Sequence, residues 1–288
     1  MIRNTYPLFC PQILYKDRFG GNLQPFLEMN PSIFFDTDAN QWIVLVRGVN
    51  YRKYKNNIYT CYAHPLHSIY WIGRGPSINN LTWQELKYDY GDKKQFSSYW
   101  NGVEDIRFMN REEVICCVPQ LNPGGRPALF TAKIDYERNL LTYFTPCLPN
   151  HTTEKNWMPF EQNKVIYSVC PLIVKEVHHD KKEEIPLTSS QRVELEGYHG
   201  STNGVLLTDD SWLFLIHKNK TNTVEHRWLR IHSNKTVTFS PPFTFFKDSY
   251  IEFPCGLVLK DDSVYVSLGV NDCQAFVLEF DANYVLKV

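Results

Sequence analysis

The feature that most constrains the fold is a hairpin pattern that recurs along the chain. In each copy a short apolar run is followed by an acidic turn and a second apolar run. Short runs of β-branched and aromatic residues bounded by such turns predict antiparallel strand pairs. The sequence therefore predicts an all-β chain built from repeated hairpins. The three clearest copies occupy residues 32–47, 204–217 and 255–268.

Two weaker copies, at residues 104–118 and 154–169, lie between these hairpins. The last four copies start about 50 residues apart, and repeats of this length with several strands each are typical of propeller blades. We therefore predict a five-bladed β-propeller. The five copies start near residues 30, 104, 155, 202 and 253. The strand pairs that we expect to complete the blades are 128–135 with 140–144, 226–232 with 236–239, and 275–280 with 284–288.

The interval between the first and second copies is longer than the others. We expect a long insertion there, about residues 53–101, between the first and second blades, where it would shape a site over the central funnel. Two short segments, 81–88 and 189–195, are the best candidates for helices. We expect a single propeller domain that spans residues 1–288.

Charge and hydropathy limit the partners of the chain. Its 30 Lys and Arg against 31 Asp and Glu give a net charge of −1, so no overall basic field would attract nucleic acid. No apolar stretch approaches the length needed to cross a bilayer, and the first residues lack the order of a secretion signal. We expect a cytoplasmic protein with no membrane span and no nucleic-acid partner.

A propeller would bring the starts of the five copies together, because the first strand of each blade lines the central axis. These positions carry carboxylate, amide and basic side chains near aromatic residues such as Trp100 and Tyr198. Such a mixture suits sugars, which offer hydroxyls to polar groups and apolar ring faces to aromatics. The basic side chains also suit a phosphate. The residues expected to meet are Asn30, Arg47, Glu104, Asp105, Arg107, Lys155, Asn156, Asn203, Glu252 and Asp272, with His217 in a structural role.

Several motifs in the same regions carry a family resemblance. In chain order they are Glu104-Asp105-Ile106-Arg107, Glu154-Lys155-Asn156-Trp157, Tyr198-His199-Gly200-Ser201-Thr202-Asn203-Gly204, His226-Arg227-Trp228, Glu252-Phe253-Pro254-Cys255-Gly256-Leu257 and Gly269-Val270-Asn271-Asp272. Apart from the His-Arg-aromatic pattern, they resemble the mannoside phosphorylases of glycoside hydrolase family 130. They resemble still more closely, that pattern included, the propeller modules found beside, or acting as, glycosyltransferases. The resemblance spans about residues 30–280.

The resemblance implies a five-bladed propeller that binds a glycoside at its axis. In the phosphorylases the aspartate of an Asp-x-Arg motif is the general acid, which points to Asp105 as the catalytic residue. A buried carboxyl there with a raised pKa would suit that role. The resemblance also implies that a phosphate is held by Arg47, Arg107 and Lys155. The side chains expected to contact the sugars or other parts of the substrate are Asn30, Glu104, Asn156, His199, Asn203, Arg227, Glu252 and Asp272.

The fourth copy, Gly200-Ser201-Thr202-Asn203-Gly204, and the His226-Arg227 pair depart from the phosphorylases, which favours sugar transfer. We therefore expect a glycosyltransferase that moves a sugar from a nucleotide-sugar or sugar phosphate donor to a glycan acceptor. The alternatives are a phosphorylase or hydrolase acting on β-mannosides, a non-catalytic glycan-binding propeller, and a protein-interaction propeller. We expect no cofactor. We also expect no metal at Asp36-Thr37-Asp38, because this motif occupies an outer-turn position that sibling hairpins also fill with aspartates.

Overall fold

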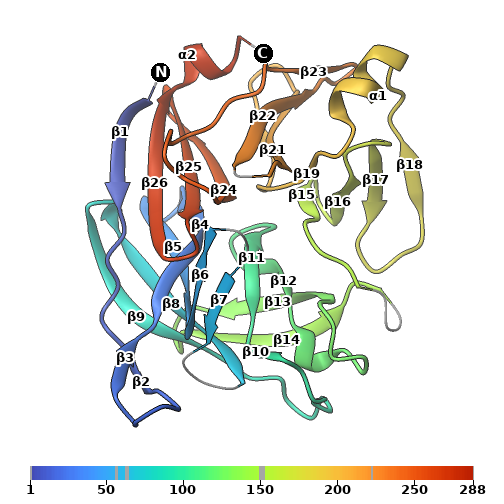
Figure 1. Cartoon of the computed structure of the whole chain (residues 1–288). Helices are drawn as coiled ribbons and strands as arrows, with labels where there is room; N and C mark the ends of the chain where they lie inside the picture. Colours follow the sequence, from blue (N-terminus) through green and yellow to red (C-terminus); the bar gives the residue numbers. More distant parts are fainter. Residues whose placement is uncertain (1, 56–57, 62–64, 149–152, 222, 288) are drawn as a thin grey trace.

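The structure is a computed structural model that describes residues 2–55, 58–61, 65–148, 153–221 and 223–287. The described residues form five antiparallel units arranged around a common centre (Figure 1). The first strand of each unit lies innermost, and each following strand lies farther out. The all-β, five-bladed propeller predicted from the hairpin repeat is confirmed.

The strands of each unit follow chain order, except that β6 (Tyr51–Tyr54) and β7 (Ile58–Cys61) interrupt the first unit and β1 (Ile2–Pro7) completes the fifth. The first contains β4 (Leu27–Asp36), β5 (Gln41–Val49), β8 (Leu66–Ser77) and β9 (Asn80–Tyr88). The second contains β11 (Glu104–Phe108), β12 (Glu113–Cys117), β13 (Leu129–Asp135) and β14 (Leu140–Pro146). The third contains β15 (Met158–Phe160), β16 (Lys164–Ser168), β17 (Ile173–Glu176) and β18 (Lys182–Glu184). In the fourth, two short inner strands precede the outer three: β19 (His199–Gly200), β20 (Val205–Leu206), β21 (Trp212–Asn219), β22 (Val224–Ile231) and β23 (Val237–Phe239). The fifth contains β24 (Glu252–Lys260), β25 (Ser263–Val270), β26 (Gln274–Asp281) and β1 (Ile2–Pro7).

Smaller elements connect or cover these units. Two hairpins form separate two-stranded sheets: β2 (Leu14–Lys16) with β3 (Leu23–Pro25), and β6 with β7. The short strand β10 (Trp100–Asn101) pairs in parallel with β8. The described helices are the 3-10 turn η2 (Pro119–Leu121), α1 (Ser189–Leu195) and α2 (Ala282–Val285). The helix expected at 189–195 is α1, and its first turn is closed by a capping box in which Thr188 and Gln191 bond each other's backbone N–H groups. None of the described helices is long and apolar enough to span a membrane.

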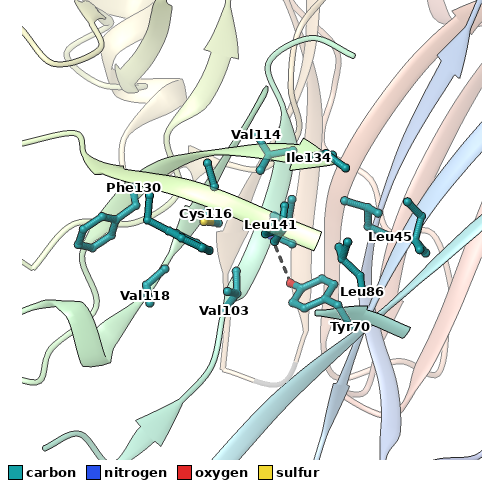
Figure 2. Packing of buried hydrophobic residues seen from close by; sticks show 14 of the residues in the cluster. Leu45, Tyr70, Leu86, Val103, Val114, Cys116, Val118, Phe130, Ile134 and Leu141 are labelled. Carbon is teal, nitrogen blue, oxygen red and sulfur yellow. Dashed lines mark hydrogen bonds between the residues drawn. The ribbon is translucent and has the colours of Figure 1, made fainter. Parts of the chain in front are cut away.

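Hydrophobic clusters fill the space between every pair of neighbouring units, which closes the ring. Figure 2 shows the cluster between the first and second units, where Leu45 and Tyr70 pack near Val114 and Leu141. The Tyr70 hydroxyl also accepts a hydrogen bond from the backbone N–H of Ile106, 3.3 Å away in β11. Each blade is therefore buried on both faces. The remaining clusters join the second to the third unit, the third to the fourth, the fourth to the fifth, and the fifth to the first.

Burial on both faces explains one wrong prediction. Residues 81–88, expected to be a helix, form most of the strand β9. Leu81 and Trp83 pack toward the cluster shared with the fifth unit, whereas Leu86 packs into the cluster shared with the second. A strand that is apolar on both faces loses the strict alternation that identifies strands in sequence.

The first and fifth units also differ from the prediction. The range 53–101, expected as an insertion, instead supplies β8 and β9 of the first unit, apart from residues 56–57 and 62–64, which lie outside the described residues. The partner expected for β26 at 284–288 is wrong as well: α2 covers part of that segment, residue 288 lies outside the described part of the chain, and β1 from the other end of the chain pairs with β26 instead. The one-domain span of 1–288 stays a prediction, to which this pairing adds support.

Candidate active site

Two inner strands carry β-bulges at the same end of the propeller axis. The register of β4 shifts between Met29 and Ser32, and that of β11 shifts between Glu104 and Arg107. Within these bulges Asn30 and Asp105 adopt a positive φ, 42° and 48°. A bulge re-aims a side chain that would otherwise follow the strand's alternation. Here the two side chains meet, and Asn30 Nδ2 donates to Asp105 Oδ1 at 2.9 Å.

Arg47 joins the two acidic residues that open β11. Its side chain, 4% exposed, extends from β5, and its two terminal nitrogens lie 3.1 Å from Glu104 Oε1 and 3.2 Å from Asp105 Oδ1. Its Nε donates to the hydroxyl of Ser68 at 2.9 Å, which fixes the guanidinium plane. One buried cation therefore serves two carboxylates, and it ties the first blade to the second.

The carboxyl groups of this site differ in their pKa. Burial alone would raise the pKa of Asp105, but Arg47, Arg107, the Asn30 amide and Lys155 together hold it below its usual range. The expectation of a raised pKa at Asp105 is therefore wrong for the free protein. Burial does raise the pKa of Glu104, against the opposing effect of Arg47, and that of Asp272, against Lys53 and Arg47.

Arg107 is buried and bonds backbone groups next to the site. Its Nε donates to the carbonyl of Ser201, its Nη1 donates to the carbonyl of Asp105 at 3.1 Å, and its guanidinium lies 5.5 Å from the ring centre of Phe253. The side chain is fully buried, and its Nη2 is buried without a hydrogen-bond partner. Direct contact with a phosphate, expected from the sequence, does not fit this placement. Arg107 instead supplies positive charge and fixes the Asp105 backbone.

Lys155 and Asn156 approach from the segment before β15. Lys155 is exposed, and its charge helps to lower the pKa of Asp105 and opposes the rise in the pKa of Glu104, which places it near them. It forms no hydrogen bond or ion pair with another described residue. Asn156 has a φ of 64°, and its carbonyl lies so close to Gly200 that a Cβ there would be 2.2 Å away. The glycine thus lets this segment pack against β19.

A histidine pair lies beside this segment, in the fourth blade. His199 and His217 face each other across β19 and β21, with ring centres 5.8 Å apart. His217 is buried, and its Nδ1 shares a 2.7 Å hydrogen bond with the hydroxyl of Ser201. Burial, followed by the charges of His226, His199, Arg107 and Lys155, holds the pKa of His217 well below its usual range. His217 is therefore neutral at pH 7, whereas His199 is exposed.

Glu252 does not face the site, contrary to the sequence-based expectation. It is 1% exposed, and its Oε2 lies 3.0 Å from Nε2 of the buried His226. The same carboxylate accepts hydrogen bonds from the Ser249 hydroxyl and from the backbone N–H groups of Phe245 and Phe246. Its oxygens are thus occupied in holding the segment before β24.

Arg227 and Asn203 also have other partners than those expected. Arg227 extends toward α1, where it bonds the hydroxyl of Tyr198 at 3.0 Å and Glu194 at 3.2 Å. The Asn203 amide bonds both backbone groups of Leu257, at 3.0 and 2.9 Å. It therefore pairs with β24 as a neighbouring strand would. Both side chains support the blades.

Sequence reasoning missed Ser68 and Lys53 and gave His217 only a structural role. No local signal marks Ser68, because its importance comes from pairing between β5 and β8.

Among the described residues, no group of three or more His, Cys, Asp or Glu side chains is arranged to hold a metal. Asp36 caps its own turn, accepting hydrogen bonds from the N–H groups of Asp38 and Ala39, and pairs with Arg111 at 2.9 Å.

The fold of this chain is shared by proteins of known structure. No protein-family model matches the chain, and no curated protein matches its sequence. Solved structures do match it. A β-1,2-mannobiose phosphorylase from Listeria innocua, in complex with β-1,2-mannobiose, superposes over 99% of this chain and 98% of its own, with a TM-score of 0.61 and 12% identity. The chain has the fold of that enzyme.

Two further structures agree with this match. A mannose phosphorylase from Leishmania mexicana, in complex with a phosphate ion, covers 96% of this chain and 89% of its own, with a TM-score of 0.53 and 12% identity. A glycosyl hydrolase from Bacteroides ovatus covers 98% and 93%, with a TM-score of 0.60 and 12% identity. At these identities the comparison establishes the fold that was expected from the family 130 resemblance.

Proposed function

We propose that the chain is a carbohydrate-active enzyme, a glycoside phosphorylase acting on mannosides at the Glu104–Asp105 end of the axis. The observation that carries the proposal is the pair of carboxylates bridged by buried Arg47, beside the exposed Lys155 and the neutral His217. The shared fold of mannoside phosphorylases supports the phosphorylase alternative over the glycosyltransferase that the sequence favoured.

In the proposed reaction a phosphate oxygen bonds to the anomeric carbon of a mannosyl unit while the glycosidic C–O bond breaks. The departing oxygen takes a proton, which leaves a sugar 1-phosphate and a shortened glycan. A carboxyl group of the pair supplies that proton, and we assign this role to Asp105. Lys155 would meet the phosphate, with Arg107 adding charge from behind.

The low pKa of Asp105 is compatible with this role once phosphate binds. The positive charges of Arg107 and Lys155 help to hold the pKa below its usual range. A bound phosphate would offset those charges, and the sugar would exclude water, so both effects would raise the pKa of Asp105 in the complex. The carboxyl would then carry a proton only when both substrates are in place.

The experiment is a product analysis with β-1,2-mannobiose. We expect mannose 1-phosphate to form when inorganic phosphate is added and little free mannose to form without it. Release of free mannose regardless of phosphate would make the chain a hydrolase. Transfer from a nucleotide-sugar would restore the transferase interpretation, and binding of the disaccharide without turnover would make it a glycan-binding propeller. The cytoplasmic location stays a prediction.

A further inference from the structure

A cavity lies at the end of the axis opposite the Asp105 site. It has a volume of about 740 Å³, and every blade contributes to its wall. Asp105 precedes Phe108 by three positions in β11, and Asn30 precedes Phe34 by four in β4, so the strands separate this cavity from the Asp105 site by roughly 10 Å or more. One wall residue from each blade, in blade order, is Phe34, Phe108, Phe160, Val205 and Leu257.

Aromatic pairs form much of the wall, and each joins two blades. The ring centres of Phe34 and Phe108 are 5.3 Å apart, and those of Phe160 and Trp212 are 5.1 Å apart. Phe34 and Trp212 are only half-buried, and Leu206 at the rim is 54% exposed. The cavity therefore presents accessible apolar faces that the fold itself does not cover.

The rim is polar and almost uncharged. Exposed amide side chains come from Asn110, Gln162 and Asn163 in the turns that follow the inner strands. Among the described residues that line the cavity, Glu161 is the one with a charged side chain, and it is paired with Lys164 at 2.6 Å. A site with aromatic faces, amide groups and no free charge suits a neutral ligand that combines apolar faces with hydroxyl groups better than it suits a charged one.

A peptide fits the same cavity less well. Peptides that bind a sheet commonly add a strand to an exposed edge. At this end of the axis the edge of β24 at Leu257 is already bonded by Asn203, and the carbonyl of Pro159 accepts the N–H of Gly204 at 2.8 Å. The backbone groups that a peptide would pair with at these positions are therefore occupied.

We propose that this far-end cavity is a second saccharide-binding site, which takes a neutral oligosaccharide of a few residues. Its volume falls within the range of small-ligand sites. The proposal does not depend on the reaction assigned to Asp105, because none of the cavity's lining residues belongs to that site. Such a site would hold a glycan chain on the enzyme without cleaving it.

The test uses the full chain with methyl-labelled Leu and Val, titrated with neutral manno-, gluco- and galacto-trisaccharides. We expect at least one to shift the methyl signals of Leu257 and Leu259 in a saturable way. Leu206→Arg, an exposed rim change, should weaken that binding at least tenfold, and Gln162→Ala should weaken it several-fold. Val193→Arg on α1, where Val193 is also exposed but does not line the cavity, should bind as the unmodified chain does. Any turnover at the Asp105 site should be the same in all these variants.

Three results would overturn the proposal. One is that no trisaccharide moves these methyl signals. Another is that Leu206→Arg binds as tightly as the unmodified chain. The third is that an apolar peptide, and no sugar, shifts the same methyls. Loss of turnover with normal methyl shifts would count against the proposed reaction alone, so the two proposals fail separately.

Discussion

The amide of Asn30 donates a hydrogen bond to the carboxylate of Asp105, 75 positions away, at 2.9 Å. Both residues lie in bulges with a positive φ, a conformation that Asn and Asp tolerate better than most residues. The contact joins the inner strands of two blades at the point where we place the chemistry. It also contributes to the low pKa of Asp105.

Replacing this amide with a second carboxylate should shift the pH dependence of activity. In Asn30→Asp a like charge replaces a hydrogen-bond donor, so the pKa of Asp105 should rise and the pH–rate profile should move to higher pH. Asn30→Gly, which keeps the positive φ and removes the bond without adding charge, should move the profile less. Identical profiles for the two variants would show that the charge at position 30 does not reach the reacting group.

Removing the bridging cation should cost stability as well as activity. Arg47→Met leaves Glu104 and Asp105 without their shared partner, and breaking a buried ion pair from one side costs about 3–5 kcal/mol. We expect a matching fall in the free energy of unfolding, measured by urea denaturation. Arg47→Lys should recover part of it, because a lysine keeps the charge but lacks the planar fork of donors with which the guanidinium reaches both carboxylates and Ser68. Full stability in Arg47→Met would mean that the bridge is weak.

The stability of the Asp272→Asn variant, relative to that of the unmodified chain, should increase as the pH rises. Burial raises the pKa of Asp272, so the folded state holds its proton more tightly than the unfolded chain does. The stability that this provides is present below the unfolded pKa of about 4 and is lost as the pH rises through the folded value. The thermal midpoint of Asp272→Asn, relative to the unmodified chain, should therefore be higher at pH 7 than at pH 4.

Glu252→Gln should loosen the segment before β24 and leave the chemistry in place. Its carboxylate bonds His226, Ser249 and two backbone N–H groups, and hydrogen bonds to a buried charge are worth about 1.5–3 kcal/mol. We expect lower stability and faster proteolysis within residues 243–249, with a catalytic rate per folded molecule close to that of the unmodified chain. A selective loss of rate with normal stability would return Glu252 to the site.

The hairpin repeat was enough to predict the propeller, because each hairpin is a local feature with its own turn signal. Pairings between distant segments left no such signal. The partner of β26 comes from the other end of the chain, and β9 was mistaken for a helix because it is apolar on both faces. Propensity and periodicity are properties of one segment, whereas the completion of a blade requires two distant segments to pair.

The site was likewise predictable where the signal is local and not where it depends on contacts between distant segments. Asn30, Glu104 and Asp105 meet because the start of each repeat reaches the axis, and Arg47 joins them from the returning strand β5. The sequence does indicate both. Whether a side chain at such a start faces the axis depends on bulges and neighbouring segments, as Glu252 and Asn203 demonstrate. The lowered pKa of Asp105 could not be predicted from the sequence, since it depends on Arg47, Asn30 and Lys155 from other parts of the chain as well as on the neighbouring Arg107.

The most direct test of Asp105 as the proton donor compares Asp105→Asn with Asp38→Asn, the same chemical change in the site and in an exposed outer turn. The measurement is the rate of mannose 1-phosphate formation from β-1,2-mannobiose and phosphate, with folding checked by thermal midpoint. We predict that Asp105→Asn lowers the rate by about 10²–10⁴-fold while the variant remains folded, and that Asp38→Asn leaves the rate unchanged. A folded Asp105→Asn variant that forms mannose 1-phosphate at the unmodified rate would contradict the account.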